Sequence, residues 1–128
     1  MRTILFLAVL LVLVFFPAMA QDAVKVDPKR YKVELENNQA RILRIHYGPR
    51  EKSVMHEHPG SVAVFLTDGD VKFTAPDGKT TESHVKAGQV IWENAGKHLP
   101  DNTGGKPFEL VLVELKARNA PPKAATAK

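Results

Sequence analysis

The stretch of sequence that decides the fold is HEHPGSVAVFLT, residues 56–67. Its second half, Val62–Thr67, is a nearly continuous apolar run, which is typical of a β-strand covered on both faces. Its first half places His56 and His58 two residues apart, and alternate residues of a strand point to the same side. Pro59-Gly60 indicates a turn between the halves. The stretch therefore predicts two short strands, the first with two imidazoles facing one point.

The segments on both sides of this stretch repeat the pattern of a short strand followed by a turn. Tyr31, Val33 and Leu35 alternate with charged residues, so we expect the first strand to have one apolar and one solvated face. The expected strands are residues 31–36, 43–47, 54–58, 62–67, 71–74, 80–85, 90–92 and 108–115. Short strands with frequent turn signals indicate an all-β sandwich or barrel, and hairpin connections favour antiparallel sheets.

The first 20 residues have the pattern of a secretory signal peptide. Arg2 is followed by the unbroken apolar run Ile4–Phe16, and Ala18-Met19-Ala20 is a small-x-small cleavage pattern. We expect cleavage before Gln21, which would place the mature protein in the periplasm or outside the cell, without stable membrane association. The alternative is an uncleaved anchor, because residues 3–21 carry no charge and are just long enough to span a bilayer.

The rest of the chain is expected to form one domain. Residues 21–29 are a polar lead-in, residues 30–117 form the β domain, and residues 118–128, rich in Ala, Pro and Lys, are expected to be a disordered tail. The formal net charge is +4, and acidic and basic residues are interspersed, which argues against nucleic acid as a partner. The chain has no Cys, which excludes disulfides and thiolate chemistry and is compatible with export.

A third candidate ligand is His98, just after the turn predicted at Asn94–Gly96. A His-x-His pair alone is weak evidence for a metal site, and a single loop histidine is weaker still. The remaining two histidines, His46 and His84, fall on polar phases of their strands and are expected to be exposed.

Five further residues lie near the candidate ligands in sequence. Glu57 lies between His56 and His58 and should point away from them. Asp101 and Asn102 follow His98 and could hydrogen-bond to a metal-bound imidazole. Two aromatic residues, Phe65 and Trp92, are expected in the core or in a pocket wall.

Together these segments resemble the two motifs of small single-domain cupins, over roughly Val33 to Leu115. The resemblance rests on Gly48, His56-x-His58 and Gly69 in the first motif, and on Gly88, Asn94-Ala95-Gly96, His98 and Asn102 in the second. It implies an antiparallel jelly-roll cupin β-barrel, with His56, His58 and His98 as metal ligands that point into the barrel mouth. It also suggests a homodimer.

The chain departs from the family pattern where the family usually has a glutamate after the second histidine. Residues 59–63 contain no carboxylate, so the implied ligand set is reduced to three neutral imidazoles. Such a set leaves the ion its full charge and can leave coordination positions open. It favours a divalent transition metal (Zn, Fe, Ni, Cu or Mn) over Mg or Ca. Metal occupancy is expected to fall as the pH drops through about 6.

The sequence leaves three functions open. The first is an exported barrel that binds a divalent metal through three histidines and holds a small-molecule ligand in its mouth. The second is a metal-dependent enzyme, dioxygenase- or isomerase-like, in which the ion activates water, oxygen or a substrate. No general base stands out in the motifs, so catalytic residues are not assigned. The third is a degenerate cupin that binds no metal.

The apolar run and small-x-small exit of the first 20 residues predict the N-terminus of the mature protein. When the full chain is expressed in a secreting bacterium, the intact mass should correspond to a chain that begins at Gln21. A mass that retains Met1, measured on protein from the membrane fraction, would contradict cleavage and favour the anchor.

Overall fold

The computed structural model describes residues 21–117, so the predicted signal peptide and the predicted tail lie outside it. The described elements are α1 (Ala23–Val26), β1 (Tyr31–Glu36), β2 (Ala40–Tyr47), β3 (His56–His58), β4 (Ser61–Phe65), β5 (Gly69–Thr74), β6 (Thr80–Val85), β7 (Val90–Glu93), β8 (Gly96–Asn102) and β9 (Phe108–Leu115). Within residues 21–117, no helix is long and apolar enough to cross a membrane.

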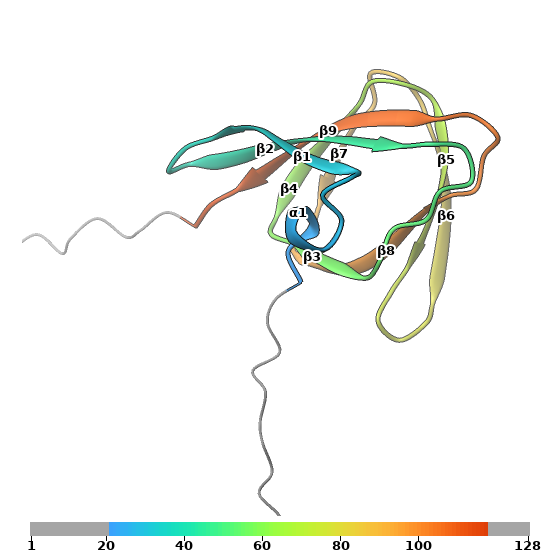
Figure 1. Ribbon diagram of the computed structural model, residues 1–128, viewed down its shortest axis with the longest axis horizontal. Helices are drawn as coiled ribbons and strands as arrows, with labels where there is room; N and C mark the ends of the chain where they lie inside the picture. Colours follow the sequence, from blue (N-terminus) through green and yellow to red (C-terminus); the bar gives the residue numbers. More distant parts are fainter. Residues whose placement is uncertain (1–20, 118–128) are drawn as a thin grey trace, which may run out of the picture.

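The strands form two antiparallel sheets that face each other (Figure 1). The five-stranded sheet has the order β1-β2-β9-β4-β7, and the four-stranded sheet has the order β3-β8-β5-β6. From β3 to β5, and again from β6 to β9, the chain alternates between the two sheets. This arrangement is the all-β, antiparallel jelly roll that the sequence predicts.

The core lies between the sheets and is built by strict alternation along β2 and β9. The inward residues pair across these strands as Leu43 with Leu112, Ile45 with Leu110 and Tyr47 with Phe108. All six side chains are buried, and the rings of Tyr47 and Phe108 stack with centroids 5.0 Å apart. Burial of each large apolar side chain contributes about 1.5–3 kcal/mol. The period-two pattern therefore decides which side chains can reach the barrel interior.

The first strand differs from its predicted pattern. Tyr31 is buried, but Val33 and Leu35 are 43% and 50% exposed. A bulge between Val33 and Leu35 shifts the register, so the two side chains no longer share a face. The β1–β2 hairpin also extends beyond the second sheet (Figure 1), which leaves the far end of β1 without cover. The expectation of an apolar, covered face along the whole strand is therefore wrong.

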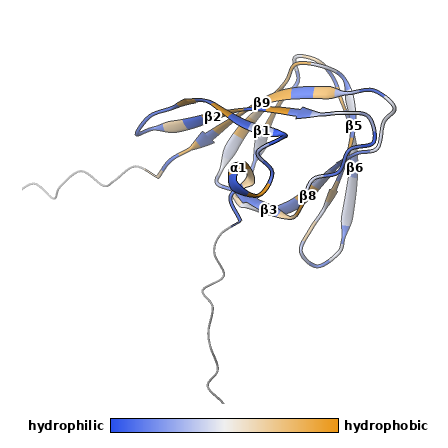
Figure 2. Ribbon diagram, in the orientation of Figure 1, coloured by the Kyte–Doolittle hydropathy of each residue, from blue (hydrophilic) through white to orange (hydrophobic). Residues whose placement is uncertain are grey.

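An apolar surface crosses the outer side of the five-stranded sheet, and we call it the outer apolar face. Its first row pairs Leu35 with Ile42, Ile42 with Val113, Val113 with Val62 and Val62 with Trp92. Its second row pairs Val111 with Val64 and Val64 with Val90. Figure 2 shows that β9 is hydrophobic over most of its length, as a strand with apolar residues on both faces should be. Trp92 is 56% exposed here, so its predicted place in the core or pocket wall is wrong, whereas Phe65 is buried.

The lead-in packs against the barrel beside β3. The backbone N–H of Glu57 donates to the carbonyl of Gln21 at 2.8 Å. Asp22 caps α1 by accepting a hydrogen bond from the Val24 N–H at 2.9 Å, and it also pairs with Arg41 at 2.7 Å. Ala23 is fully buried. The lead-in is thus joined both to the strand that carries two histidines and to an inward-facing arginine.

Candidate metal centre

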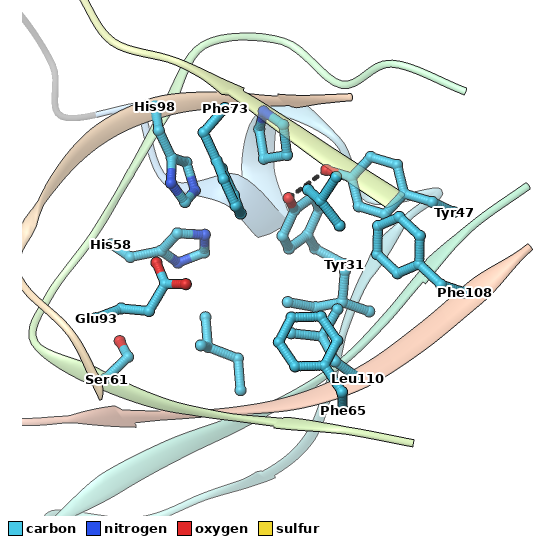
Figure 3. Close-up of a pocket in the computed structure, with 14 residues that line it drawn as sticks. Tyr31, Tyr47, His58, Ser61, Phe65, Phe73, Glu93, His98, Phe108 and Leu110 are labelled. Carbon is cyan, nitrogen blue, oxygen red and sulfur yellow. Dashed lines mark hydrogen bonds between the residues drawn. The ribbon is translucent and has the colours of Figure 1, made fainter. Parts of the chain in front are cut away.

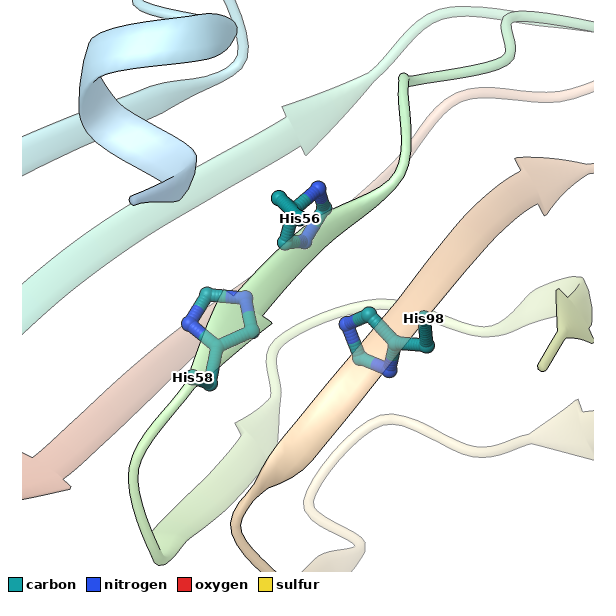
Figure 4. A group of neighbouring side chains, drawn as sticks. All are labelled: His56, His58 and His98. Carbon is teal, nitrogen blue, oxygen red and sulfur yellow. The ribbon is translucent and has the colours of Figure 1, made fainter. Parts of the chain in front are cut away.

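The structure brings the three predicted histidines together (Figure 4). His56 and His58 share one face of β3, and His98 lies opposite His56 in the antiparallel pairing of β3 with β8. One ring nitrogen from each residue lies within 4.8 Å of the other two. A tetrahedral ion bound at about 2.0–2.1 Å to each imidazole places the ligand nitrogens about 3.4 Å apart, so the three side chains would have to close on it by up to about 1.5 Å.

The position of His98 differs from the predicted one. His98 lies inside β8 and not in a turn, so all three imidazoles project from strands. Asn102 donates to the carbonyls of Gly48 and Lys106, both at 2.8 Å, and Asp101 faces Lys72 at 3.4 Å. Neither residue supports a ligand histidine, so the prediction that they contact His98 is wrong.

The hydrogen bonds of His56 orient it for an ion. Its Nδ1 lies 2.8 Å from the carbonyl oxygen of Val54. A carbonyl only accepts, so Nδ1 carries the proton and the Nε2 lone pair is free. Nε2 is buried and has no hydrogen-bond partner within the described residues. An unpaired buried polar atom is costly, and a metal ion would satisfy it. The residues present therefore fit a bound metal.

Glu114 holds His58 in the same tautomer as His56, with the proton on Nδ1. Its Oε1 accepts a hydrogen bond from His58 Nδ1 at 2.6 Å, and its Oε2 accepts one from Arg41 Nε at 2.6 Å. Burial would raise the pKa of Glu114, but the hydrogen bonds from His58 and Arg41 lower it overall, so the carboxylate stays charged. A carboxylate behind a ligand imidazole fixes its orientation and leaves Nε2 free for the metal.

Sequence reasoning missed Glu114, although a signal for it exists. In β9 the inward positions read Phe108, Leu110, Leu112 and Glu114. A carboxylate on the apolar phase of a strand is buried only when a partner compensates its charge. That phase, read along the strand, would have singled out Glu114 as a site residue.

Burial keeps two of the imidazoles neutral. Desolvation and the neighbouring His58 lower the pKa of His56 to about 4. Desolvation and the other two histidines lower the pKa of His98 to about 3. Neutral imidazole is the form that binds metal. His56 and His98 therefore remain competent well below pH 6, where the sequence alone placed the loss of the metal.

Two of the three histidines, His58 and His98, border a cavity of about 40 Å³ between the sheets (Figure 3). Its walls are mostly apolar and aromatic, among them Phe65, Phe73 and Leu110. The hydroxyls of Tyr31 and Tyr47 hydrogen-bond to each other at 2.5 Å, and burial raises the pKa of both, so both stay protonated. The volume corresponds to a few water molecules at roughly 10–15 Å³ each.

A second carboxylate, Glu93, faces this cavity beside His58 (Figure 3). It comes from β7, where the register sets it opposite Ser61 of β4. Desolvation raises its pKa, although the nearby His58 opposes the shift. It is not one of the three clustered ligand residues. Sequence reasoning missed it, because the motif alone does not show that β7 pairs with β4.

The other histidines and Glu57 lie where the sequence predicts. His46 is exposed, and exposed His84 pairs with Asp70 at 2.6 Å. Glu57 is half-buried on the opposite side of β3 from the two histidines, by strand alternation.

Comparison with known proteins supports the fold. The model of the Cupin domain family matches residues 43–114. A cupin domain from Bordetella pertussis Tohama I is similar at 24% identity, with a TM-score of 0.64, over 68% of this chain and 92% of that one. An uncharacterised conserved protein with a double-stranded β-helix domain from Klebsiella pneumoniae is 26% identical, with a TM-score of 0.55, over 71% and 78% of the two chains. No curated protein matches the chain.

The lowered pKa values of His56 and His98 predict acid sensitivity of the metal-free protein. Both are neutral when folded but take up a proton when unfolded below about pH 6.5, so their stabilisation is present above that pH and is lost as the pH falls toward 4. The free energy of unfolding should drop by about 2 kcal/mol per histidine between pH 6.5 and 5. Urea titrations should show a shallower pH dependence for His98→Gln but not for His46→Gln. Identical pH slopes in all three proteins would contradict the burial argument.

Proposed function

Because the chain belongs to the Cupin domain family, we propose that it binds a divalent transition metal through His56, His58 and His98 and holds a small molecule beside that metal. The observation that carries this proposal is the convergence of three strand-borne imidazoles, one of which has a buried, unpartnered Nε2. Three imidazoles leave at least one coordination position for another ligand. When bound, the ion would supply Lewis-acid or redox chemistry at that position.

The surroundings of the histidines support a binding role. The apolar walls exclude bulk water, and the cavity of about 40 Å³ admits only a small group beside the imidazoles. A larger molecule would have to lie partly in the mouth, with its smallest polar end inside. The protein residues then have two tasks, which are to hold the imidazole tautomers through Val54 and Glu114 and to shape the ligand.

A metal-dependent enzyme is the second candidate, and Glu93 is the observation that favours it. A partly buried carboxylate with a raised pKa beside a metal site can exchange a proton with a bound molecule. The two candidates share one metal site. Turnover of a bound small molecule by the metal-loaded protein would distinguish the enzyme from the binding module.

Export is proposed on the pattern of residues 1–20 alone. A periplasmic or secreted protein of this kind meets metals and small molecules without the competition of cytoplasmic thiols. The absence of Cys from the chain is compatible with that environment.

We further propose that a second copy of the chain covers the outer apolar face. The eight positions of its two rows, at about 4.8 Å between strands and about 6.8 Å between successive outward residues, present roughly 260 Å² before side-chain relief is counted. That is about a third of the ~800 Å² per partner of a standard interface, so the apolar rows would form its centre and flanking residues its rim. Beside the apolar rows, Arg44 is already paired with Glu34 and Glu109, which leaves little free charge for an anionic partner. The apolar run Val62–Thr67 also predicts a strand covered on both faces, and the monomer covers one.

The metal proposal predicts which histidines matter. Calorimetric titration with Zn(II), Fe(II) and Ni(II) should show binding that is lost in His56→Ala, His58→Ala and His98→Ala alike, because each ligand projects from a strand and has no substitute. Glu114→Gln should weaken binding by about 10–100-fold. His46→Ala and His84→Ala are the controls and should bind like the wild type. Equal damage in the controls would show wrong ligands, and no binding by the wild type would favour a metal-free cupin.

The dimer proposal predicts that one substitution on the outer apolar face converts the dimer into a monomer. Light scattering at micromolar concentration should give twice the chain mass for the wild type and a monomer mass for Trp92→Glu, because Trp92 ends the first apolar row. Val26→Glu changes an exposed apolar residue on α1, away from this face, and should remain dimeric. A monomeric wild type would refute the proposal.

A further inference from the structure

We infer that Glu93 determines the class of molecule that the site accepts: a small, uncharged ligand with a hydrogen-bond donor, and not an anion. This inference rests on the metal site proposed above. Glu93 is not one of the three clustered histidines, and it comes from β7, whereas the histidines come from β3 and β8.

The position of Glu93 follows from the sheet register. β7 is the last strand of the five-stranded sheet, and its pairing with β4 sets Glu93 opposite the fully buried Ser61. Both side chains line the cavity together with His58 (Figure 3). The outward neighbour of Glu93, Trp92, lies on the other face of the same strand. Strand alternation therefore directs the carboxylate into the cavity.

The carboxylate of Glu93 has no partner in the structure. In residues 21–117 no hydrogen bond or ion pair engages it; burial raises its pKa, and the nearby His58 opposes that shift. Glu114, in contrast, has both oxygens occupied by His58 and Arg41. A partly buried carboxylate without a partner is costly, so a donor on a bound ligand would be stabilised there. An ion on the imidazoles would also favour the charged form of Glu93.

The other residues that line the cavity also favour an uncharged ligand over an anion. Among the described residues that line the cavity there is no Lys or Arg, and Glu93 is the one carboxylate. The hydroxyls of Tyr31 and Tyr47 are paired with each other. Glu93 therefore sets the sign of the field next to an ion. In a partly desolvated site, it would repel an anionic ligand and attract a donor.

The experiment compares an anionic and a neutral probe on the cobalt-loaded protein. Wild type, Glu93→Gln and Glu57→Gln are saturated with Co(II), and azide or imidazole is titrated while the visible cobalt spectrum is followed. Glu57→Gln is the matched control, because it removes a carboxylate from the same neighbourhood on the side of β3 that faces away from the histidines. Glu93→Gln should bind azide at least about tenfold more tightly, while its affinity for imidazole stays equal or falls.

The possible outcomes distinguish a failure of the proposed role of Glu93 from a failure of the proposed metal site. An unchanged cobalt spectrum in Glu93→Gln without probe shows that the fold and the metal ligands are intact. Equal azide affinity in wild type and Glu93→Gln, or an equal gain in Glu57→Gln, would overturn the role of Glu93 and leave the metal site standing. A wild type that binds no Co(II) would overturn the proposed metal site and this inference with it.

Discussion

The antiparallel pairing of β3 with β8 sets His56 opposite His98, and strand alternation then places His58 on the same face. β3 has only three residues, so it cannot hold this register by its own hydrogen bonds alone. Gln21 accepts from one side of it, through the backbone N–H of Glu57. The jelly roll in turn holds β8 against β5. The three-histidine arrangement is therefore a product of the whole barrel, and a short motif in isolation would not form it.

A network of charges, buried at Glu114 and His58 and partly buried at Arg41 and Asp22, extends this constraint to the N-terminal lead-in. Asp22, Arg41, Glu114 and His58 form a continuous chain of contacts of 2.6–2.7 Å. Buried charges are costly unless each is paired, and removal of one member of such a network typically costs several kcal/mol. The capping of α1 by Asp22 thus stabilises the lead-in and also completes the pairing of the arginine behind His58. The result of these pairings is one imidazole, His58, held in a fixed orientation. A purely structural core does not need a charged side chain there, so the network is typical of a functional site.

Much of this could be predicted from the sequence, because strand periodicity is local. Alternation in residues 43–47 and the apolar run of residues 108–115 identified the core strands, and the resemblance of His56-x-His58 and His98 to the two cupin motifs identified the cluster. Pairing between distant strands could not be predicted in the same way. The turn signal at Asn94–Gly96 is followed by no apolar run, so the sequence predicts no strand at Gly96–Asn102 and places His98 in a turn. Glu93 reaches the site only because β7 pairs with β4, whereas the inward phase of β9 marks Glu114 as buried without naming His58 as its partner. The bulge in β1 and the exposure of Trp92 likewise depend on neighbours and not on local pattern.

Membership in the Cupin domain family explains the barrel, but the site in this chain differs from the family pattern by its missing motif carboxylate. Glu114 behind His58 and Glu93 across the cavity supply carboxylates from other strands. The central claim is that His56, His58 and His98 together bind one metal ion. X-ray absorption at the zinc edge, on protein loaded with one equivalent of zinc, tests it most directly. The account predicts a first shell with three imidazole nitrogens at about 2.0–2.1 Å. A shell of oxygen atoms alone, or with fewer than three imidazoles, would contradict it.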